Sequence, residues 1–372
     1  MGNRRPTLTD VAQRAGVSRA TASNAYNRPN QLSAPVRARV LAVAVELGYA
    51  GPDPAARQLR TGRTGTVAVL VLDRPGYAFS DPAAQMFLDG LAEGLGPTTT
   101  GLLLLSGSAQ RGGPDPAAVR AAAMDAVVSY CVPADTPALV PVLERRLPLV
   151  TVDGALGRGD ACVAVQNATG QAAVLWHLLG LGHRRFGIVS MPLRADGFYG
   201  LAEDSRRTEL HDPSSRDRLT AAWAELAAAG VDPACVPLAV ARSSSRAEGR
   251  ELTHQLLSVP AARRPTAVVA LSDLLALGVL DAAHDLGLRV PHQVSVTGFD
   301  GIPDTALCDP PLTTVAQDHY AKGQFAAELV TELIEGRSAR EIVLPTTLVV
   351  RASTGPAPLD REGIDSTNGA FR

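Results

Sequence analysis

The sequence contains a single lysine and few aromatic residues. It also lacks the common catalytic and phosphate-binding motifs. Its only lysine, Lys322, follows Ala321, so the chain contains no G-x-x-x-x-G-K-[ST] phosphate-binding loop. The motifs H-E-x-x-H, G-x-S-x-G and, after a strand, G-x-G-x-x-G are also missing. The most common enzyme signatures are therefore excluded, and we expect no catalytic activity.

Cysteine is scarce too, and its spacing excludes a common class of metal site. The four cysteines contain no C-x-x-C pair and have no histidines nearby at zinc-ligand spacing; they are Cys131, Cys162, Cys235 and Cys308. This pattern favours buried thiols in a reducing compartment over a disulfide pair. We expect no metal and no cofactor.

The sequence also lacks long apolar runs. The first ten residues lack the apolar run of a signal peptide, and no stretch reaches the roughly 18 apolar residues of a membrane span. We therefore expect a cytoplasmic protein with no membrane partner. A length of 372 residues predicts two or three packing units.

Charge is distributed unevenly, although the whole chain carries a net charge of only -2. Residues 1–63 hold ten arginines against Asp10, Glu46 and Asp53, a net charge of +7, which leaves -9 for the remainder. A basic segment on an acidic body is typical of nucleic-acid binding, because contacts to phosphate supply most sequence-independent affinity. A merely solvated arginine face is the alternative.

Three short helices are predicted in this basic segment. Thr7 and Asp10 have the spacing of a capping box, and an apolar stripe continues from Leu8 until Gly16 permits a left-handed turn. Ser18 is placed to cap a second helix at about 19–26. Ser33 is placed to cap a third helix, which ends before Gly48. Two helices joined by a short glycine-containing turn indicate a helix-turn-helix unit.

The second of these helices is the expected DNA reader. Ala22 and Ala25 suit packing, which leaves four residues facing outward near the helix N-terminus: Arg19, Ala20, Ser23 and Asn24. Arg19 is the best candidate base reader, because its guanidinium can bond guanine O6 and N7 together. A phosphate contact or plain solvation remains the alternative for Arg19.

These motifs resemble the headpiece of the LacI family of bacterial repressors. The resemblance rests on Thr7 through Ser18, Thr21-Ala22-Ser23, Asn27, Leu47-Gly48-Tyr49 and Ala56-Arg57-Gln58-Leu59. It implies DNA contacts from thirteen residues: Thr7, Leu8, Ser18, Arg19, Ala20, Thr21, Ser23, Asn24, Asn27, Ser33, Tyr49, Ala56 and Leu59. It also implies a hinge helix in which Leu59, beside Ala56, wedges between base pairs in the minor groove; an ordinary core leucine is the alternative.

The proposed hinge departs from the family pattern at two places. One extra residue separates Tyr49 from Pro52, and Asp53 replaces the usual asparagine. Pro54 falls in the first turn of the hinge helix, which proline tolerates.

From Thr66 onward, short apolar runs alternate with helical patterns. Buried strands are predicted at 67–72, 102–105, 126–128, 149–152, 186–189, 267–271 and 294–297. Helices are predicted near 82–95, 136–146, 168–181, 215–229, 272–286 and 318–335. This alternation indicates a parallel sheet covered on both faces, with ligands at the carboxyl ends of the strands.

The LacI resemblance continues across this region, to about residue 354. It is carried by Gly182-His183-Arg184-Arg185, Arg218, Pro265-Thr266-Ala267, Ser272-Asp273, Gly298-Phe299-Asp300, Pro311 through Val315 and Val349 through Thr354. The implied fold is an all-α helix-turn-helix headpiece followed by a periplasmic-binding-protein-like α/β domain of two interleaved Rossmann-like subdomains. We place the three crossing strands near 160, 300 and 315.

These crossings define the expected domain organisation. The DNA-binding headpiece spans 1–51, the hinge helix and linker 52–65, and the effector-binding and dimerisation domain 66–354. Within the last, the N-subdomain covers about 66–160 and 300–316, and the C-subdomain about 161–299 and 317–354. A polar, Pro- and Gly-rich tail at 355–372 has no leucine heptad, which argues against a coiled-coil tetramer and for a homodimer.

The resemblance also places a small-molecule effector between the subdomains. The matching positions are Asp153, Arg218, Ser272 and Asp300, with Gln317 and the loop around Phe79 and Asp81 as weaker candidates. Carboxylates and a guanidinium bond vicinal hydroxyls in pairs, which suits a carbohydrate. The alternatives are structural: a turn cap for Asp300, an N-cap for Ser272, and pairing of Arg218 with Asp217 or Glu225.

Together these observations predict a transcriptional repressor that binds a pseudo-palindromic double-stranded operator as a homodimer. Two other classes of protein are alternatives. A periplasmic sugar carrier is disfavoured by the headpiece and the missing signal peptide. An enzyme using His183 or Asp273 lacks any nucleophile, base and orienting group at motif spacing, and His183 is expected to be structural. The region 191–217 is longer and more polar than the usual connection in the LacI family, and a lid over the pocket is one interpretation of it.

Overall fold

The computed structural model divides into two units, which are described separately. Contacts group residues 1–64 into one unit and residues 65–372 into the other. The residues described are 5–52, 58, 62–72, 75–96, 101–107, 113–154, 159–194, 196–208, 210–338 and 340–358. The predicted hinge residues Ala56 and Leu59 lie outside these ranges.

The first unit contains the three predicted helices. They are α1 (Leu8–Arg14), α2 (Arg19–Asn27) and α3 (Ala34–Glu46), with a short 3-10 turn at Pro29–Gln31. The capping box is present, since the Thr7 hydroxyl accepts from the Asp10 N–H and the Asp10 carboxylate accepts from the Thr7 N–H. Ser18 caps α2 through the Thr21 N–H, whereas Ser33 stands at the N-cap of α3 without a side-chain hydrogen bond.

Small apolar side chains form the core of this unit. The fully buried members are Val11, Ala12, Ala15, Ala22, Ala25, Val40 and Ala44. Gly16 and Gly48 have φ values of +64° and +67°, the left-handed conformation in which glycine is favoured. The predicted helices, core and the caps at Thr7 and Ser18 are therefore confirmed, whereas the predicted cap by the Ser33 side chain is wrong.

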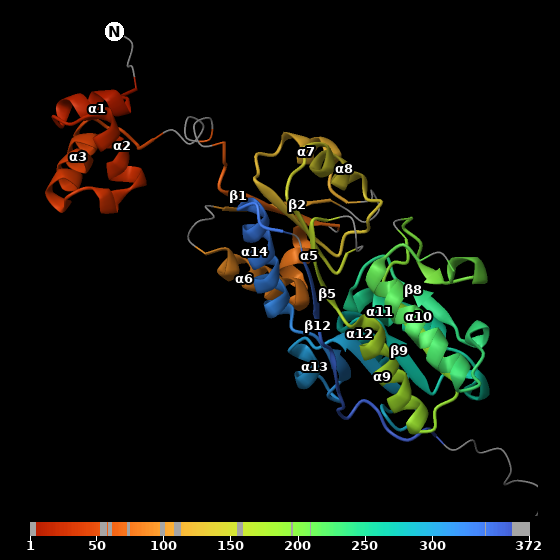
Figure 1. Cartoon of the computed structure of the whole chain (residues 1–372). Coiled ribbons are helices and arrows are strands. Elements are labelled where there is room, and N and C mark those ends of the chain that lie inside the picture. Colours follow the sequence, from red (N-terminus) through yellow and green to blue (C-terminus); the bar gives the residue numbers. More distant parts are fainter. Residues whose placement is uncertain are drawn as a thin grey trace, which may run out of the picture. The chain divides into compact units, whose positions relative to one another are not determined.

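The second unit contains two separate sheets (Figure 1). The first has the strand order β12-β5-β4-β3-β1-β2, and all its pairings are parallel. Its strands are β1 (Thr66–Val71), β2 (Gly101–Ser106), β3 (Ala126–Tyr130), β4 (Leu149–Val152), β5 (Ala161–Val165) and β12 (Glu341–Leu344). This sheet and its helices form the N-subdomain.

Helices cover both faces of the first sheet. They are α5 (Pro75–Ser80), α6 (Pro82–Leu95), α7 (Pro116–Ala121), α8 (Val140–Glu144) and α14 (His319–Ile334). Helices α6 and α14 pack side by side on one face, where a Cβ at Gly90 would come within 2.1 Å of the Tyr320 carbonyl oxygen. This close approach requires glycine and lets α6 and α14 pack tightly against each other.

The second sheet belongs to the C-subdomain and has the order β13-β11-β10-β9-β6-β8-β7. Its strands are β6 (Phe186–Ser190), β7 (Gly200–Leu201), β8 (Leu238–Val240), β9 (Ala267–Ala270), β10 (Ser295–Asp300), β11 (Thr313–Ala316) and β13 (Thr347–Val349). Its helices are α9 (Asn167–Gly180), α10 (Pro213–Ala228), α11 (Arg246–Leu257), α12 (Asp273–Asp285) and the short α13 (Asp304–Leu307). Helices α9 and α10 pack on one face and α11 and α12 on the other.

The chain passes between the subdomains three times, at positions that correct the sequence-based boundaries. The passages lie between β5 and α9, between β11 and α14, and between β12 and β13. The sequence-based boundaries place residues 300–316 in the N-subdomain, but β11 pairs with β10 and β13 in the second sheet. They place residues 317–354 in the C-subdomain, but α14 and β12 belong to the N-subdomain. Segment 161–165 likewise pairs with β4 in the first sheet.

Segment 191–217 is not a single helix or strand. It contains β7, a 3-10 turn at Asp204–Arg206 and the start of α10. His211, just before α10, lies 3.2 Å from the Asp135 carboxylate of the N-subdomain. Among the described residues, none of the helices is long and apolar enough to cross a membrane.

Candidate functional site

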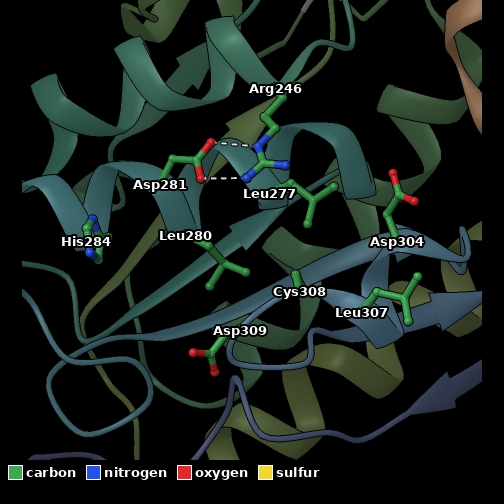
Figure 2. Close-up of a pocket in the computed structure, with 9 residues that line it drawn as sticks. All are labelled: Arg246, Leu277, Leu280, Asp281, His284, Asp304, Leu307, Cys308 and Asp309. Carbon is green, nitrogen blue, oxygen red and sulfur yellow. Dashed lines mark hydrogen bonds and ion pairs between the residues drawn. The ribbon is translucent and has the colours of Figure 1, made fainter.

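A groove is lined by α12 and by the segment around α13 in the C-subdomain (Figure 2). Its volume is about 480 Å³, and its walls include Leu277, Leu280 and Cys308. At its rim, the Arg246 guanidinium bonds both oxygens of Asp281 at 2.6 and 2.7 Å. Leu307, which also lines the groove, is 83% exposed.

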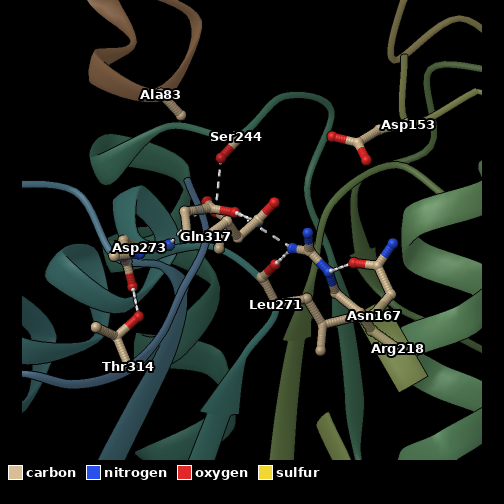
Figure 3. Close-up of polar contacts among 12 residues, drawn as sticks. Ala83, Asp153, Asn167, Arg218, Ser244, Leu271, Asp273, Thr314 and Gln317 are labelled. Atoms are coloured by element: carbon tan, nitrogen blue, oxygen red, sulfur yellow. Dashed lines mark hydrogen bonds and ion pairs between the residues drawn. The ribbon is translucent and has the colours of Figure 1, made fainter. Parts of the chain in front are cut away.

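A second candidate site lies where the chain passes between the subdomains (Figure 3). Buried charged and amide side chains from both subdomains meet there and bond one another. We call this set the junction cluster; its members are Asp153, Asn167, Arg218, Asp273, Asp300, Thr314, Gln317, His319 and Lys322.

Arg218 is the cation of the C-subdomain side. Helix α10, capped by Asp212, positions its side chain, which is only 4% exposed. The guanidinium donates to Asn167 Oδ1 (2.9 Å) and to the Leu271 carbonyl oxygen (2.5 Å), and stacks 3.7 Å above the Phe299 ring. It also lies 3.5 Å from Asp300 Oδ1. The alternative pairing of Arg218 with Asp217 or Glu225 is wrong, because those carboxylates bond Arg216 and Trp176.

Two carboxyl groups interact electrostatically with this cation; Asp273 is buried and Asp300 is half-buried. Asp273 Oδ2 accepts from the N–H groups of Gly301 and Ile302, and Thr314 donates to Oδ1. Asp300 Oδ1 accepts from Gln317 at 2.8 Å. Burial raises the pKa of Asp273 to about 6 and the pKa of Asp300 to about 8, and the positive charge of Arg218 opposes both shifts. The charge of Asp273 raises the pKa of Asp300 further.

Backbone geometry holds these carboxyl groups in place. Asp300 ends strand β10 with a φ of 132°, a strained value for a residue with a side chain. Two residues earlier, a Cβ at Gly298 would come within 2.2 Å of Asp273 Oδ1. Gly298 therefore leaves the room that the Asp273 carboxylate occupies.

Lys322 is the cation of the N-subdomain side and is 1% exposed. Its ammonium donates to Asp153 Oδ2 at 2.5 Å and to Gln317 Oε1 at 2.8 Å. Because the Gln317 amide nitrogen donates to Asp300, one hydrogen-bonded chain runs from Asp153 through Lys322 and Gln317 to the C-subdomain. The junction cluster therefore links the two subdomains through charged side chains.

His319 is the first residue of α14 and also belongs to the junction cluster. Its Nε2 lies 3.1 Å from the Asp300 carbonyl oxygen, and the ring is 3% exposed. Burial, followed by the charge of Lys322, lowers the pKa of His319 well below 6.5, so the ring is neutral.

The structure brings together four of the seven predicted effector residues: Asp153, Arg218, Asp300 and Gln317. Ser272 adjoins them as the N-cap of α12 and lies 2.6 Å from the Ser244 hydroxyl. Asp81 is buried as the N-cap of α6 and acts electrostatically on Asp300. Phe79, on α5, is 68% exposed, and no contact between it and the cluster is found among the described residues.

Sequence reasoning missed Asn167, Thr314, His319 and Lys322 as site residues, and Asp273 was considered only as a catalytic group. Lys322 carried a usable signal, because it is the only lysine and occupies an otherwise apolar face with Ala326 and Leu329. His183 is buried, and its ring nitrogens lie 3.0 Å from the Thr266 hydroxyl, the Ser295 hydroxyl and the Gly355 carbonyl oxygen, contacts that suit a structural role. No group of residues that could hold a metal ion is found in the described part of the chain.

The candidate nucleic-acid interface is the outer face of α2. Arg19 and Ala20 are exposed, Ser23 and Asn24 are half-buried, and Ala22 and Ala25 are buried, as their spacing predicted. Among the other predicted contacts, Asn27 is exposed and bonds the Ser23 carbonyl and hydroxyl oxygens. The Tyr49 ring packs edge-on against Tyr26, with centroids 6.0 Å apart.

Family comparisons divide the chain as the structure does. Residues 7–51 match the model "Bacterial regulatory proteins, lacI family", and residues 175–354 match a periplasmic binding protein-like domain. The chain is 40% identical to the HTH-type transcriptional regulator Rv3575c of Mycobacterium tuberculosis over 357 residues, which cover 95% of this chain and 98% of that protein.

Comparison with solved structures indicates the same family. A LacI-family transcriptional regulator from Corynebacterium glutamicum has a TM-score of 0.71 and 31% identity, covering 96% of this chain and all of that one. The complex of the transcriptional regulator CelR with cellobiose has a TM-score of 0.66 and 26% identity, covering 94% and 100% of the two chains. The chain therefore belongs to the LacI family and is a DNA-binding transcriptional regulator.

Proposed function

We propose that this regulator is a repressor whose affinity for a pseudo-palindromic operator is controlled by a small-molecule effector, a carbohydrate, bound at the junction cluster. The observation that carries this proposal is the chain of buried charged side chains that joins the subdomains through Gln317. A ligand that bonds members on both sides changes the relative free energies of two subdomain arrangements, and such differential affinity is what allosteric control requires.

The effector contacts we propose are the predicted residues Phe79, Asp81, Asp153, Arg218, Ser272, Asp300 and Gln317. Their carboxylate, amide and guanidinium groups suit the paired hydrogen bonds of vicinal hydroxyls. CelR, which is similar to this chain over nearly its whole length, has been solved with cellobiose, and this supports a carbohydrate as the effector here.

DNA contact is assigned to the headpiece at 1–51 and to a hinge at 52–65. Arg19 reads a base, helped by Ala20, Ser23 and Asn24 of the same helix. The remaining headpiece contacts position the helix on the phosphates; they are Thr7, Leu8, Ser18, Thr21, Asn27, Ser33 and Tyr49. Ala56 and Leu59 supply the minor-groove wedge.

We assign the homodimer contact to the groove beside α12 and α13 (Figure 2). An 83%-exposed leucine, Leu307, stands beside the apolar walls formed by Leu277 and Leu280. In a two-fold symmetric pair the same surface serves both protomers, so that each leucine enters the partner's groove. A cytoplasmic dimer places two headpieces on the two halves of one operator.

The test is selection of double-stranded DNA from a random pool by the purified full chain at near-physiological salt. We expect enrichment of a two-fold symmetric sequence. Folded, dimeric protein that enriches no sequence over the starting pool would contradict the proposed operator recognition. Because salt weakens phosphate contacts steeply, the same selection at higher salt should keep the sequence preference while it lowers the yield.

A further inference from the structure

The three segments that lead into strands β6, β9 and β10 carry only positive formal charge. Residues 181–185, 258–266 and 286–294 contain no aspartate or glutamate and together hold five arginines: Arg184, Arg185, Arg263, Arg264 and Arg289. Because residues 64–372 have a net charge of -9, the rest of this unit carries -14. The five arginines therefore form a local exception on an acidic body.

These segments meet at one end of the second sheet. Strands β6, β9 and β10 are neighbours and run parallel, so they start at the same edge. Across this edge, Arg185 Nε donates to the Arg264 carbonyl oxygen at 3.2 Å, and the Ser295 N–H donates to the Thr266 carbonyl oxygen at 2.9 Å. We call the surface formed by the five arginines the basic end.

Main-chain oxygens hold two of these guanidinium groups in place. Arg184 Nη1 donates to the carbonyl oxygens of Leu179 and His183, at 3.2 and 2.7 Å. Arg264 donates through Nε and Nη2 to two carbonyl oxygens at the end of α11, at 3.0 and 3.1 Å. A guanidinium has five N–H groups, so each side chain keeps donors for a further partner. Because both groups are already fixed, less side-chain entropy is lost when they bind a carboxylate.

Neutralisation of helix ends accounts for only part of this charge. Helices α9, α11 and α12 all end at this edge of the sheet, and each C-terminus is equivalent to about half a negative elementary charge. Asp285, at the end of α12, is bonded by Arg250 and His254. Among the described residues, four arginines of the basic end form no salt bridge: Arg184, Arg263, Arg264 and Arg289. Their charge of +4 exceeds the roughly -1.5 of three helix ends.

Apolar side chains lie among the arginines and indicate the kind of partner. Ala261 and Ala262 are exposed, and Val259, Val290 and Pro291 are half-buried. Duplex DNA would meet such a surface with phosphates and sugars, which leave apolar side chains without a counterpart. The three segments contain no aromatic residue on which single-stranded bases could stack. A polypeptide that alternates carboxylates with apolar side chains matches both features of the basic end.

We infer that the basic end is a docking surface for another protein, which binds it through an acidic segment with apolar side chains between its carboxylates. This inference goes beyond the proposed function, since it concerns neither the operator nor the effector. The groove assigned to the homodimer is lined by other residues, so the basic end stays accessible in the dimer. A partner held here is brought to the operator together with the regulator.

Photo-crosslinking of the full chain tests where such a segment binds. The probe is a peptide of four Asp-Glu-Leu-Glu repeats in which each leucine is a photoreactive diazirine analogue, and mass spectrometry identifies the labelled residues. We expect labelling in 181–185, 258–266 and 286–294, and we expect it to decrease as salt screens the exposed charges. Because labelled positions are resolved, any labelling of the basic headpiece is measured separately.

A matched pair of double variants separates the basic end from overall charge. Arg263→Gln with Arg289→Gln removes two charges, and among the described residues neither side chain has a bonding partner that the change would disrupt. Labelling of the basic end should fall by about tenfold, because each exposed ion pair contributes a few-fold to affinity. Arg120→Gln with Arg216→Gln removes the same charge at other exposed positions and should leave this labelling unchanged.

Two results would overturn the inference directly: labelling confined to other parts of the chain, and an equal loss in the two double variants. A third concerns DNA. If Arg263→Gln with Arg289→Gln lowered affinity for a duplex without operator sequence by tenfold while the control did not, the basic end would bind nucleic acid and the inference would also fail. Operator selection and dimerisation use other residues, so their failure is distinguishable from each of these results.

Discussion

Replacing Arg218 by methionine tests whether the junction cluster holds the C-subdomain together. The change removes the hydrogen bonds to Asn167 and to the Leu271 carbonyl, and it leaves the half-buried Asp300 carboxyl without its nearest cation. A hydrogen bond to a charged group contributes about 1.5–3 kcal/mol, and the 4%-exposed Arg218 guanidinium donates two such bonds. Because these effects overlap at one site, we expect Arg218→Met to lower the free energy of unfolding by about 3–5 kcal/mol.

Arg216→Met is the matched control on the same helix. Arg216 is 49% exposed and pairs with the exposed Asp217, so its loss should cost at most about 1 kcal/mol. Urea unfolding followed by tryptophan fluorescence measures both variants, since Trp176 and Trp223 both lie in the C-subdomain. Equal destabilisation by Arg218→Met and Arg216→Met would refute this reasoning.

Three further predictions concern other parts of the molecule. Burial raises the pKa of Asp300 in the folded state, so the stabilisation from its protonated form is present at low pH and is lost as the pH rises above the ordinary 3.8. We therefore expect Asp300→Asn to be more stable than the unchanged protein between about pH 5 and pH 8. Urea unfolding across this pH range measures the difference. Thr7→Ala breaks the capping box and should reduce hydrogen-exchange protection in α1 by about fivefold, equivalent to about 1 kcal/mol. The control Ser33→Ala removes no side-chain hydrogen bond and should leave hydrogen-exchange protection in α3 unchanged. Leu307→Glu should shift the protein from dimer to monomer in sedimentation velocity, whereas Leu201→Glu, at a 47%-exposed position on β7, should remain dimeric.

Local signals predicted the headpiece well because its structure depends on neighbouring residues. The capping residues Thr7 and Ser18 and the turn at Gly16 act within a few positions of the chain, and each is found where its spacing placed it. Alternation of buried runs also located most strands of the body. Helix α11, rich in charged residues, and the four-residue strand β11 carried too weak a pattern to be predicted.

Assignment of strands to sheets could not be predicted in the same way. Segment 313–316 could join either subdomain on its pattern alone, and only its pairing with β10 and β13 decides the matter. The site was predicted in part for a similar reason. Asp300 and Arg218 matched family positions, whereas Lys322 and His319 occupy one turn of an amphipathic helix whose partner, Asp153, is 169 residues away from Lys322 in sequence.

The central claim is that this chain reads DNA sequence through α2. The most direct test measures the affinity of Arg19→Ala and of Arg57→Ala for the selected operator and for a set of its single-base variants. Arg19→Ala should remove discrimination at one operator position, worth about 1–3 kcal/mol, because a base contact specifies sequence. Arg57→Ala should lower affinity for every variant by a similar factor, as expected for a phosphate contact. Equal effects of the two substitutions at all positions would contradict base reading by Arg19.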